Sequence, residues 1–492
     1  MTWRKRGHVG TGLRGRQAAP VPRPSNQLQP PAPPLEKTCR LDDPFVSAPF
    51  WMFLDESLCA YLVALAAFQR GLSVRFHYQV LDRSPRFAHL LAQGPAGHLF
   101  SVSDGQRTHY FRRGQGDLTT REVSRIMDDK AATKALLSQH GISVPPGVVV
   151  DKARLAEAKA FCNKHPGEHF LIKPLAGTLG RGVHRDLTVD EALKILARHA
   201  DPMVLEVFIR GQEYRVHVVD GRYIGAVARL PAHVTGDGSS TVAALIEARN
   251  QVRSRHPFYR KMLINVSDDL IAELETQGLT LESVPAPAER VRLGRLPKNN
   301  AGGESPIRSY ELSNQARQVA VRVQQVLGVP NTGIDLLVCD EGTPKERVVI
   351  LEANQCPFQT ALAVPLVPAK GMGNFAAEAL IDTYFPASRS SPRWPAASFN
   401  FVALRHMLTQ CVAASLAVPT IEPGWLHQRL RIPPGNLADD QVNHHLQKMA
   451  GSNAIIQTLK QKDGAWLVDA LGSSTDLQHL WALWPVGDRC DP

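Results

Sequence analysis

The stretch GIDLLVCDEGTPKERVVILEAN, residues 333–354, constrains the fold of this chain more than any other part. Two apolar runs, IDLLVC and VVIL, flank a polar turn, and this pattern predicts a β-hairpin. Side chains two residues apart on a strand share a face, so Glu352 and Asn354 point the same way. Folding the hairpin about its turn brings Asp335 opposite them.

Three oxygen-bearing side chains on one face suit Mg²⁺, which takes a few protein oxygens and leaves its other positions to water and phosphate. Asp335, Glu352 and Asn354 are therefore candidate metal ligands, with Mn²⁺ as an alternative ion. The other interpretation is a solvated hairpin end, where these three residue types are ordinary.

The composition is that of a globular protein with a basic, proline-rich beginning. Hydrophobic residues make up 43% of the chain and charged residues 21%. Residues 1–35 hold six Lys or Arg and no acidic residue, so they cannot bury a core and are expected to be disordered. This segment carries more than half of the net charge of +10, which argues against nucleic acid as a partner.

Two further observations bear on location. The longest apolar run, residues 58–68, is about half the length that a membrane-spanning helix requires, so no membrane is expected. The seven cysteines are odd in number and lack CxxC spacing, which argues against a disulfide framework and a zinc site. We therefore expect a cytoplasmic protein.

Strand-like runs, hairpin signals and helical segments alternate along the chain and predict an α+β fold of mixed α/β subdomains. The strongest helix signals cover residues 121–140, with a Thr cap before them, and an apolar stretch at 399–416. The expected organisation is a Pro/Arg-rich tail at 1–40, an N-terminal α/β lobe at 41–120, a central domain at 121–385, a linker at 386–398 and an α+β region of unknown role at 399–492.

Two lysines and a glycine-rich loop have the chemistry of a phosphate site. Lys134 ends DKAATK on the predicted helix, and Lys173 ends the strand FLIK and enters PLAGTLGRGV. Gly177, Gly180 and Gly182 permit a close approach of backbone N–H groups to phosphate oxygens. Most glycine-rich loops are only turns, and this one is not a Walker loop.

The segment MVLEVFIRGQEYRVHVV offers groups for a nucleoside. The strand end at Glu206 and Phe208 can bind adenine through backbone atoms, and the Glu213 carboxylate can accept hydrogen bonds from ribose hydroxyls. The alternative is that Glu206 or Glu213 forms a surface ion pair with Arg210 or Arg215.

Taken in order, DKAATK, IKPLAGTLGRGV, LEVFIRGQEYRV, PAHVTGDGSST and GIDL…ILEAN resemble the motifs of the ATP-grasp superfamily of carboxylate–amine ligases. The sequence is most similar to the ATP-grasp modules of cyanophycin synthetase and of the bifunctional bacterial glutamate–cysteine ligase/glutathione synthetase, over residues 121–385. The resemblance implies an ATP-grasp domain and a role for each candidate residue. These implied roles are ATP phosphates for Lys134 and Lys173, adenine for Glu206, ribose for Glu213, Mg²⁺ for Asp335, Glu352 and Asn354, and the transferred phosphoryl group or acyl substrate for Arg229 and Arg295.

The resemblance also implies an activity. Such ligases use ATP and Mg²⁺ to convert a carboxylate into an acyl phosphate, which an amine attacks to form an amide or peptide bond. The implied substrates are amino acids or small peptides, and relatives of this kind commonly form homo-oligomers. Two alternatives stay open: a glutathione-synthetase-like ligase, and a nucleotide-binding protein that has kept the fold and lost turnover.

The sequence departs from the resembled pattern where substrate would bind. PKNNAGG places Lys298 and Asn300 in a motif that otherwise reads roughly ANLSTGG, and Arg308 stands where an acidic residue is expected. Extra cations suggest an anionic group on the substrate, and the alternative is a solvated loop.

Overall fold

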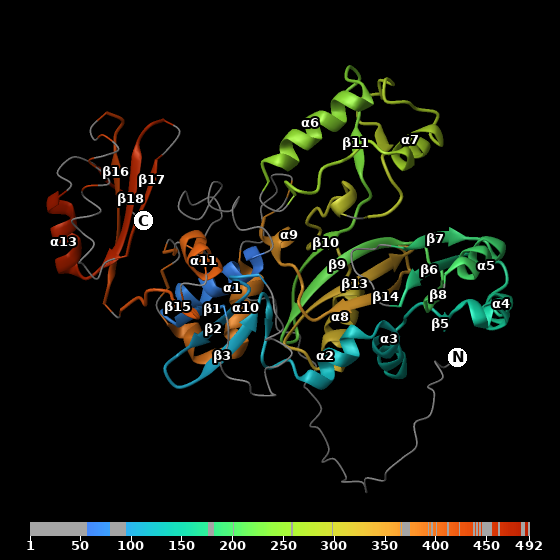
Figure 1. Ribbon diagram of the computed structural model, residues 1–492, viewed down its shortest axis with the longest axis horizontal. Coiled ribbons are helices and arrows are strands. Elements are labelled where there is room, and N and C mark those ends of the chain that lie inside the picture. The colour runs from blue at the N-terminus through green and yellow to red at the C-terminus, as the bar shows by residue number, and fades with distance from the viewer. Residues whose placement is uncertain are drawn as a thin grey trace, which may run out of the picture.

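The computed structural model describes about three-quarters of the chain. The described residues are 57–78, 95–175, 182–199, 201–256, 259–297, 299–364, 366, 374–391, 393–394, 397–399, 401–410, 413–422, 424–435, 438, 441, 444, 455–460, 463–483 and 488–490. Within them the strands form five separate sheets, and every strand pair is antiparallel. Helices pack on these sheets, so the predicted α+β class is confirmed (Figure 1).

The central sheet has the strand order β10-β9-β13-β14. Its strand β13 is buried along its whole length, because it runs between β9 and β14 with both of its faces covered. Helix α8 packs beneath it, begins at the Ser313 cap and ends at Gly328, whose φ of 65° few other residues adopt. The elements are β9 (Gln212–Val219), β10 (Arg222–Ala228), β13 (Asn331–Cys339), β14 (Arg347–Asn354) and α8 (Asn314–Leu327).

Two short helices join this layer where the sequence predicts one. Helix α2 (Arg121–Asp128) starts at the expected Thr120 cap, and α3 (Lys130–Gln139) follows it. The single helix predicted over 121–140 is wrong, because Asp129 adopts an extended conformation and its side chain accepts hydrogen bonds from the N–H groups of Ala131 and Ala132. Asp129 therefore ends one helix and caps the next.

A second sheet lies beside the central one, with the order β5-β8-β6-β7 and one face covered by α4 and α5 (Figure 1). Helix α5 begins with a complete capping box between Thr188 and Glu191. Its elements are β5 (Gly147–Val150), β6 (Phe170–Pro174), β7 (His184–Leu187), β8 (Met203–Val207), α4 (Leu155–Asn163) and α5 (Val189–Arg198).

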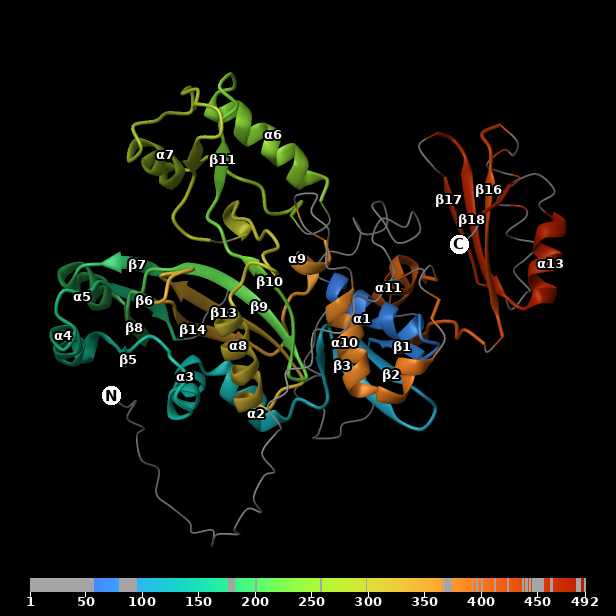
Figure 2. The same ribbon diagram turned by 180° about the vertical axis from the view of Figure 1, so that it is seen from behind.

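Between β10 and β13 the chain forms an insertion with its own small core, which rises above the central sheet in both views (Figures 1 and 2). A two-stranded sheet carries two helices there. The elements are β11 (His233–Thr235), β12 (Arg290–Arg292), α6 (Val242–Ser254) and α7 (Asp268–Glu275).

The first lobe combines residues from both sides of the central domain. Its sheet has the order β15-β1-β2-β3-β4, and helix α1, apolar on every side, is wholly buried between this sheet and the later helices α10 and α11. The elements are α1 (Leu58–Phe68), β1 (Ser73–His77), β2 (Leu99–Ser103), β3 (Thr108–Arg112), β4 (Gln115–Gly116), α10 (Phe375–Tyr384), α11 (Phe401–Thr409) and β15 (Ser415–Ala417).

Residues 386–398, expected as a linker, lie against this lobe. The Trp394 N–H donates to the carbonyl of Gln69 at 3.0 Å, and the Gln69 side chain donates to the carbonyl of Ala397 at 2.9 Å. The helix predicted over 399–416 is also wrong in its second half, because Leu416 pairs with Phe76 and makes β15 an edge strand of the sheet. The division of residues 41–120 and 386–398 into separate units stays a prediction. The described residues of both segments contribute to one continuous core.

A four-stranded sheet with one helix forms the last unit, shown in red in Figures 1 and 2. The hairpin expected around Asp463–Gly464 is confirmed by the pairing of Lys460 with Trp466. No helix among the described residues has the length and apolar character needed to cross a membrane. The elements are β16 (Leu426–Ile432), β17 (Ile455–Lys460), β18 (Trp466–Gly472), α13 (Ser474–Leu483) and β19 (Asp488–Cys490).

Candidate nucleotide and substrate site

The predicted hairpin is confirmed, and its register places the three candidate metal ligands together. Asp335 on β13 is directly opposite Glu352 on β14, and Gly333 is opposite Asn354. Directly opposed residues share a face, so Asp335, Glu352 and Asn354 all project from one side of the sheet.

An arginine that the sequence analysis did not select holds one of these carboxylates. Arg215 on β9 lies opposite Asp335, and its Nε and Nη2 each donate to one carboxylate oxygen, Nη2 to Oδ2 at 2.8 Å. Burial raises the pKa of Asp335, but the guanidinium outweighs burial and the net pKa is lowered. Asp335 therefore stays ionised.

The donor set fits Mg²⁺. Two carboxylates and one amide supply hard oxygen atoms, and the Nδ2 of Asn354 is buried without a hydrogen-bond partner, so this side chain is not committed elsewhere. Within the described residues no cluster of three or more His, Cys, Asp or Glu could hold an ion. An ion at this position would thus need oxygens from a bound phosphate as well as from the protein.

The two predicted phosphate-site lysines meet at a single carboxylate. The Nζ of Lys134 on α3 donates to one oxygen of Glu206, and the Nζ of Lys173 on β6 donates to the other at 3.0 Å. Glu206 lies on β8 and is 2% exposed. The sequence analysis expected Glu206 beside adenine, and it did not anticipate that the lysines neutralise it.

This buried triad has perturbed pKa values. Burial lowers the pKa of Lys134 to about 7, although Glu206 opposes that change. Burial raises the pKa of Glu206, and the two lysines lower it by more, so its net pKa is lowered. When both lysines are protonated, two ammonium groups around one carboxylate leave an excess of positive charge, which suits an incoming phosphate.

Glu213 contacts one arginine from each of the two sheets. Its Oε2 lies 3.4 Å from Nη2 of Arg185 on β7, and its Oε1 lies 3.3 Å from Nε of Arg229, just after β10. Burial, followed by the charge of Asp335, raises the pKa of Glu213. The surface pairing considered for Glu206 and Glu213 is wrong, because Arg210 pairs with Asp186 and Arg215 with Asp335.

A small cavity places one of the two lysines beside the hairpin. Lys134 and Glu352 both line this cavity, which has a volume of about 10 Å³ and lies between α3 and β14. Lys134, which pairs with Glu206, therefore lies close to one carboxylate of the hairpin.

The remaining nucleotide-site candidates are placed only in part. Gly182 has a φ of 67°, and a Cβ there would meet Cγ of Pro174 at 3.1 Å. Gly177 and Gly180 lie outside the described residues. The N–H of Phe208 donates to the carbonyl of His169 at 2.8 Å, so this donor is already used within the fold.

The insertion carries the second candidate arginine. Arg295 pairs with Glu273 of α7, and its side chain is 72% exposed, so it does not join the group around Glu213. Arg308 pairs with Glu311 three residues later at the surface, which favours the solvated-loop interpretation. Lys298 and the side chain of Asn300 lie outside the described part of the chain.

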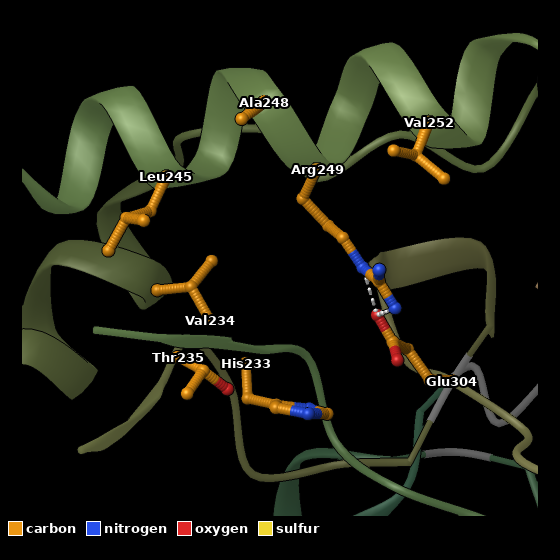
Figure 3. A pocket seen from close by; sticks show the side chains of 8 residues that line it. All are labelled: His233, Val234, Thr235, Leu245, Ala248, Arg249, Val252 and Glu304. Carbon is orange, nitrogen blue, oxygen red and sulfur yellow. Dashed lines mark hydrogen bonds and ion pairs between the residues drawn. The ribbon is translucent and has the colours of Figure 1, made fainter. Parts of the chain in front are cut away.

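A larger pocket of about 460 Å³ opens between α6 and β11 (Figure 3). Leu245, Ala248 and Val252 form its helix wall, and an ion pair between Arg249 and Glu304 lies at one end. The backbone of Glu304 pairs with Leu230, the residue after Arg229, so the pocket adjoins the arginine end of the site.

Known proteins of two kinds are similar to this chain in sequence. No protein-family profile matches the chain. Cyanophycin synthetase of Nostoc sp. (strain PCC 7120) is 32% identical over 271 residues, which are 53% of this chain and 29% of that protein. The glutathione biosynthesis bifunctional protein GshAB of Clostridium perfringens is 26% identical over 344 residues, covering 67% of this chain and 41% of that protein.

Among solved structures, a bifunctional glutathione synthetase from Pasteurella multocida superimposes with a TM-score of 0.51 and 23% identity, over 67% of this chain and 43% of that one. The chain spans less than half the length of these relatives. The antiparallel sheets of this chain therefore share the fold of that glutathione synthetase. The homologues of this chain over the matched residues are cyanophycin synthetase and GshAB.

The sequence analysis missed Arg185, Arg215 and His217. Arg215 and His217 follow Glu213 at two-residue intervals on a strand, so strand alternation alone predicts that the three side chains share a face. Arg185 carries no such local signal, because its contact with Glu213 joins two different sheets.

Proposed function

We propose that this protein is an ATP- and Mg²⁺-dependent carboxylate–amine ligase that forms an amide or peptide bond on amino acids or small peptides. The observation that carries the proposal is the convergence of Lys134 and Lys173 on Glu206, beside the face that holds Asp335 and Glu352. Cations for phosphate and oxygens for a divalent ion thus adjoin each other, as a bound triphosphate requires.

The chain's own residues have distinct parts in this reaction. Lys134 and Lys173 bind phosphate oxygens and offset charge that develops during phosphoryl transfer. Glu213 binds ribose hydroxyls, and Arg229 beside it stabilises the phosphoryl group or the acyl substrate. Asp335, Glu352 and Asn354 would hold Mg²⁺, which when bound neutralises phosphate charge.

The expected chemistry requires no protein nucleophile. A carboxylate is a poor electrophile, and transfer of the γ-phosphoryl group of ATP gives an acyl phosphate that an amine attacks. The free cysteines of the described residues fit this scheme, because burial raises the thiol pKa of all four of them: Cys59, Cys162, Cys339 and Cys356.

One observation favours a second candidate, a nucleotide-binding protein without turnover. Arg215 occupies both oxygens of Asp335, which is what a retired metal site would contain. Glu352 and Asn354 weigh against this candidate, because both stay available on the same face.

The test measures ADP and phosphate release while amino-acid and dipeptide pools are screened. An active ligase gives amine-dependent ADP release, and Glu352→Gln lowers that rate by about a thousandfold or more. Release of AMP and pyrophosphate would mean that the intermediate is an acyl adenylate and not an acyl phosphate. ATP binding without ADP release in any pool would favour the second candidate.

The proposal includes the setting of the enzyme. It acts in the cytoplasm on small molecules, with neither nucleic acid nor membrane as a partner, and a homo-oligomer is possible because relatives of this kind commonly self-associate. Mn²⁺ is expected to replace Mg²⁺ in the assay. Deletion of residues 1–38 is expected to leave ADP release nearly unchanged, whereas a nucleic-acid-dependent function would be lost with this basic segment.

A further inference from the structure

The face that carries Asp335 continues into a second row of residues without charge. One strand repeat from the Arg215–Asp335–Glu352 row, His217 on β9 lies opposite Gly333 on β13, which lies opposite Asn354 on β14. A two-residue step along a strand is about 7 Å. Pro357 and Arg215 lie over this glycine, because a Cβ at Gly333 would meet the Pro357 Cβ at 2.7 Å and the Arg215 Cδ at 3.2 Å.

Two more amide side chains lie beside this row. Asn331, two residues before Gly333, donates through Nδ2 to the carbonyl of Gly114 at 2.8 Å. A Cβ at Gly114 would lie 3.4 Å from that Nδ2 and 3.2 Å from Nε2 of Gln359. Both amides therefore meet where the central sheet touches the first lobe, and Thr360 follows Gln359 at the start of α9 (Thr360–Ala363).

These side chains form what we call the neutral cluster: His217, Asn331, Asn354, Gln359 and Thr360. Its polar atoms are buried without hydrogen-bond partners, namely both ring nitrogens of His217, Oδ1 of Asn331, Nδ2 of Asn354, both amide atoms of Gln359 and Oγ1 of Thr360. His217, Gln359 and Thr360 are each 1% exposed, so bulk water does not satisfy these atoms. Buried polar groups are almost always paired, and each unpaired group costs about 1–3 kcal/mol.

The chemistry of the cluster indicates what would pair with it. Asn354 and Gln359 offer amide N–H donors, while Asn331 and Gln359 offer amide oxygens. The His217 ring adds two buried nitrogen atoms without hydrogen-bond partners. The nearest charges, Arg215 and Asp335, already satisfy each other. A group that donates and accepts without carrying charge fits this inventory, and a carboxylate or ammonium does not.

We propose that the neutral cluster binds a carboxamide or peptide group of the substrate whose carboxylate is activated in the adjoining charged row. The identification of the ligand as a substrate rests on the proposed ligase function. Its carboxamide chemistry rests on the geometry of the cluster. A substrate whose reacting carboxylate lies beside the charged row extends its amide about 7 Å along the strands into the cluster.

Binding is tested without turnover. The full chain is titrated by calorimetry with L-glutamine and glycyl-L-alanine as amide probes, and with L-glutamate and L-norleucine as matched probes that lack the amide of L-glutamine. The amide probes are expected to bind about tenfold or more tightly. Equal affinities, or no binding of either amide probe by protein that still binds ATP, overturn the proposal. Absence of ADP release alongside selective amide binding would instead overturn the ligase function alone.

Variants separate binding from a merely structural role. Gln359→Met and Thr360→Val remove the unpartnered polar atoms at nearly constant volume. They are expected to weaken amide-probe binding about tenfold, leave ATP binding within about twofold, and leave the unfolding midpoint unchanged or raised. Gln106→Met, on an exposed turn of the same lobe, is the matched control and should change none of the three.

A different result has a clear meaning. If buried water alone satisfies the cluster, both variants lower the unfolding midpoint. Their relative affinities for amide probes and matched probes then equal those of the unaltered protein. That combination overturns the proposal.

Discussion

Arg215 and Asp335 face each other across β9 and β13, and the guanidinium donates to both carboxylate oxygens. The carboxylate expected to bind a metal ion is thus paired with a cation that belongs to the protein. The pair is buried, with side-chain exposures of 18% for Arg215 and 10% for Asp335, so its loss should be costly.

The first prediction concerns this pair. Asp335→Asn leaves the guanidinium of Arg215 buried without its counterion, and the free energy of unfolding should fall by about 3–5 kcal/mol. Urea denaturation measures it. The double variant Arg215→Met/Asp335→Leu should recover most of the loss, since no unpaired charge remains. Arg308→Ala, which breaks an exposed pair, is the control and should cost less than about 1 kcal/mol.

The second prediction concerns the uptake of a proton when the nucleotide binds. Burial lowers the pKa of Lys134 to about 7, so above pH 7 much of the free protein carries this lysine neutral. A bound triphosphate favours the ammonium form, so nucleotide binding should take up a proton, and affinity should fall by up to about tenfold per pH unit above pH 7.

Calorimetry of ATP binding in two buffers of different ionisation enthalpy measures this uptake. Lys134→Arg keeps a permanent charge and should abolish it. Equal uptake by both proteins would show that another group supplies the effect.

The third prediction separates the two candidate arginines. Arg229 adjoins Glu213, whereas Arg295 is 72% exposed and engaged by Glu273. Arg229→Met should lower the rate of ADP release by about a hundredfold or more if, as we propose, this charge stabilises the phosphoryl group or the acyl substrate. Arg295→Met should lower it less than about tenfold. Steady-state kinetics with the substrate found in the screen decides, and a larger effect at Arg295 would mean that the insertion carries the catalytic cation.

The fourth prediction concerns the first lobe. A Cβ at Gly116 would lie 2.3 Å from the Tyr384 hydroxyl, so Gly116→Ala should cost about 1–3 kcal/mol of unfolding free energy. Gly294→Ala is the matched control, because a Cβ there meets nothing within 4 Å. Thermal unfolding of both variants tests this contact between β4 and α10, and equal stabilities would contradict it.

Local patterns predicted the hairpin well. Strand alternation and the polar turn were sufficient to place Asp335 opposite Glu352, since both signals lie within 22 consecutive residues. The same reasoning could not find the partner of Glu206, because Lys134 is 72 residues away in the chain. Arg185 was missed for the same reason: its contact depends on how two sheets pack, and no periodicity encodes that.

The largest errors came from non-local pairing. Residues 399–416 are apolar enough to predict one helix, but pairing with β1 outweighs helix propensity at Ser415–Ala417. The break at Asp129 had a visible signal, since Asp is a common helix cap, and it was overlooked because its neighbours favour helix.

The composition of the first lobe has a consequence for how this polypeptide acquires its structure. Helix α1 is enclosed partly by α10 and α11, which lie more than 300 positions later, and β1 gains its outer neighbour only from β15. Nearly the whole chain must therefore leave the ribosome before the apolar surface of α1 is fully buried. A translation product that stops at residue 385 would lack α11 and β15, and it would leave α1 partly exposed and prone to chaperone capture or aggregation, even with the central sheet complete.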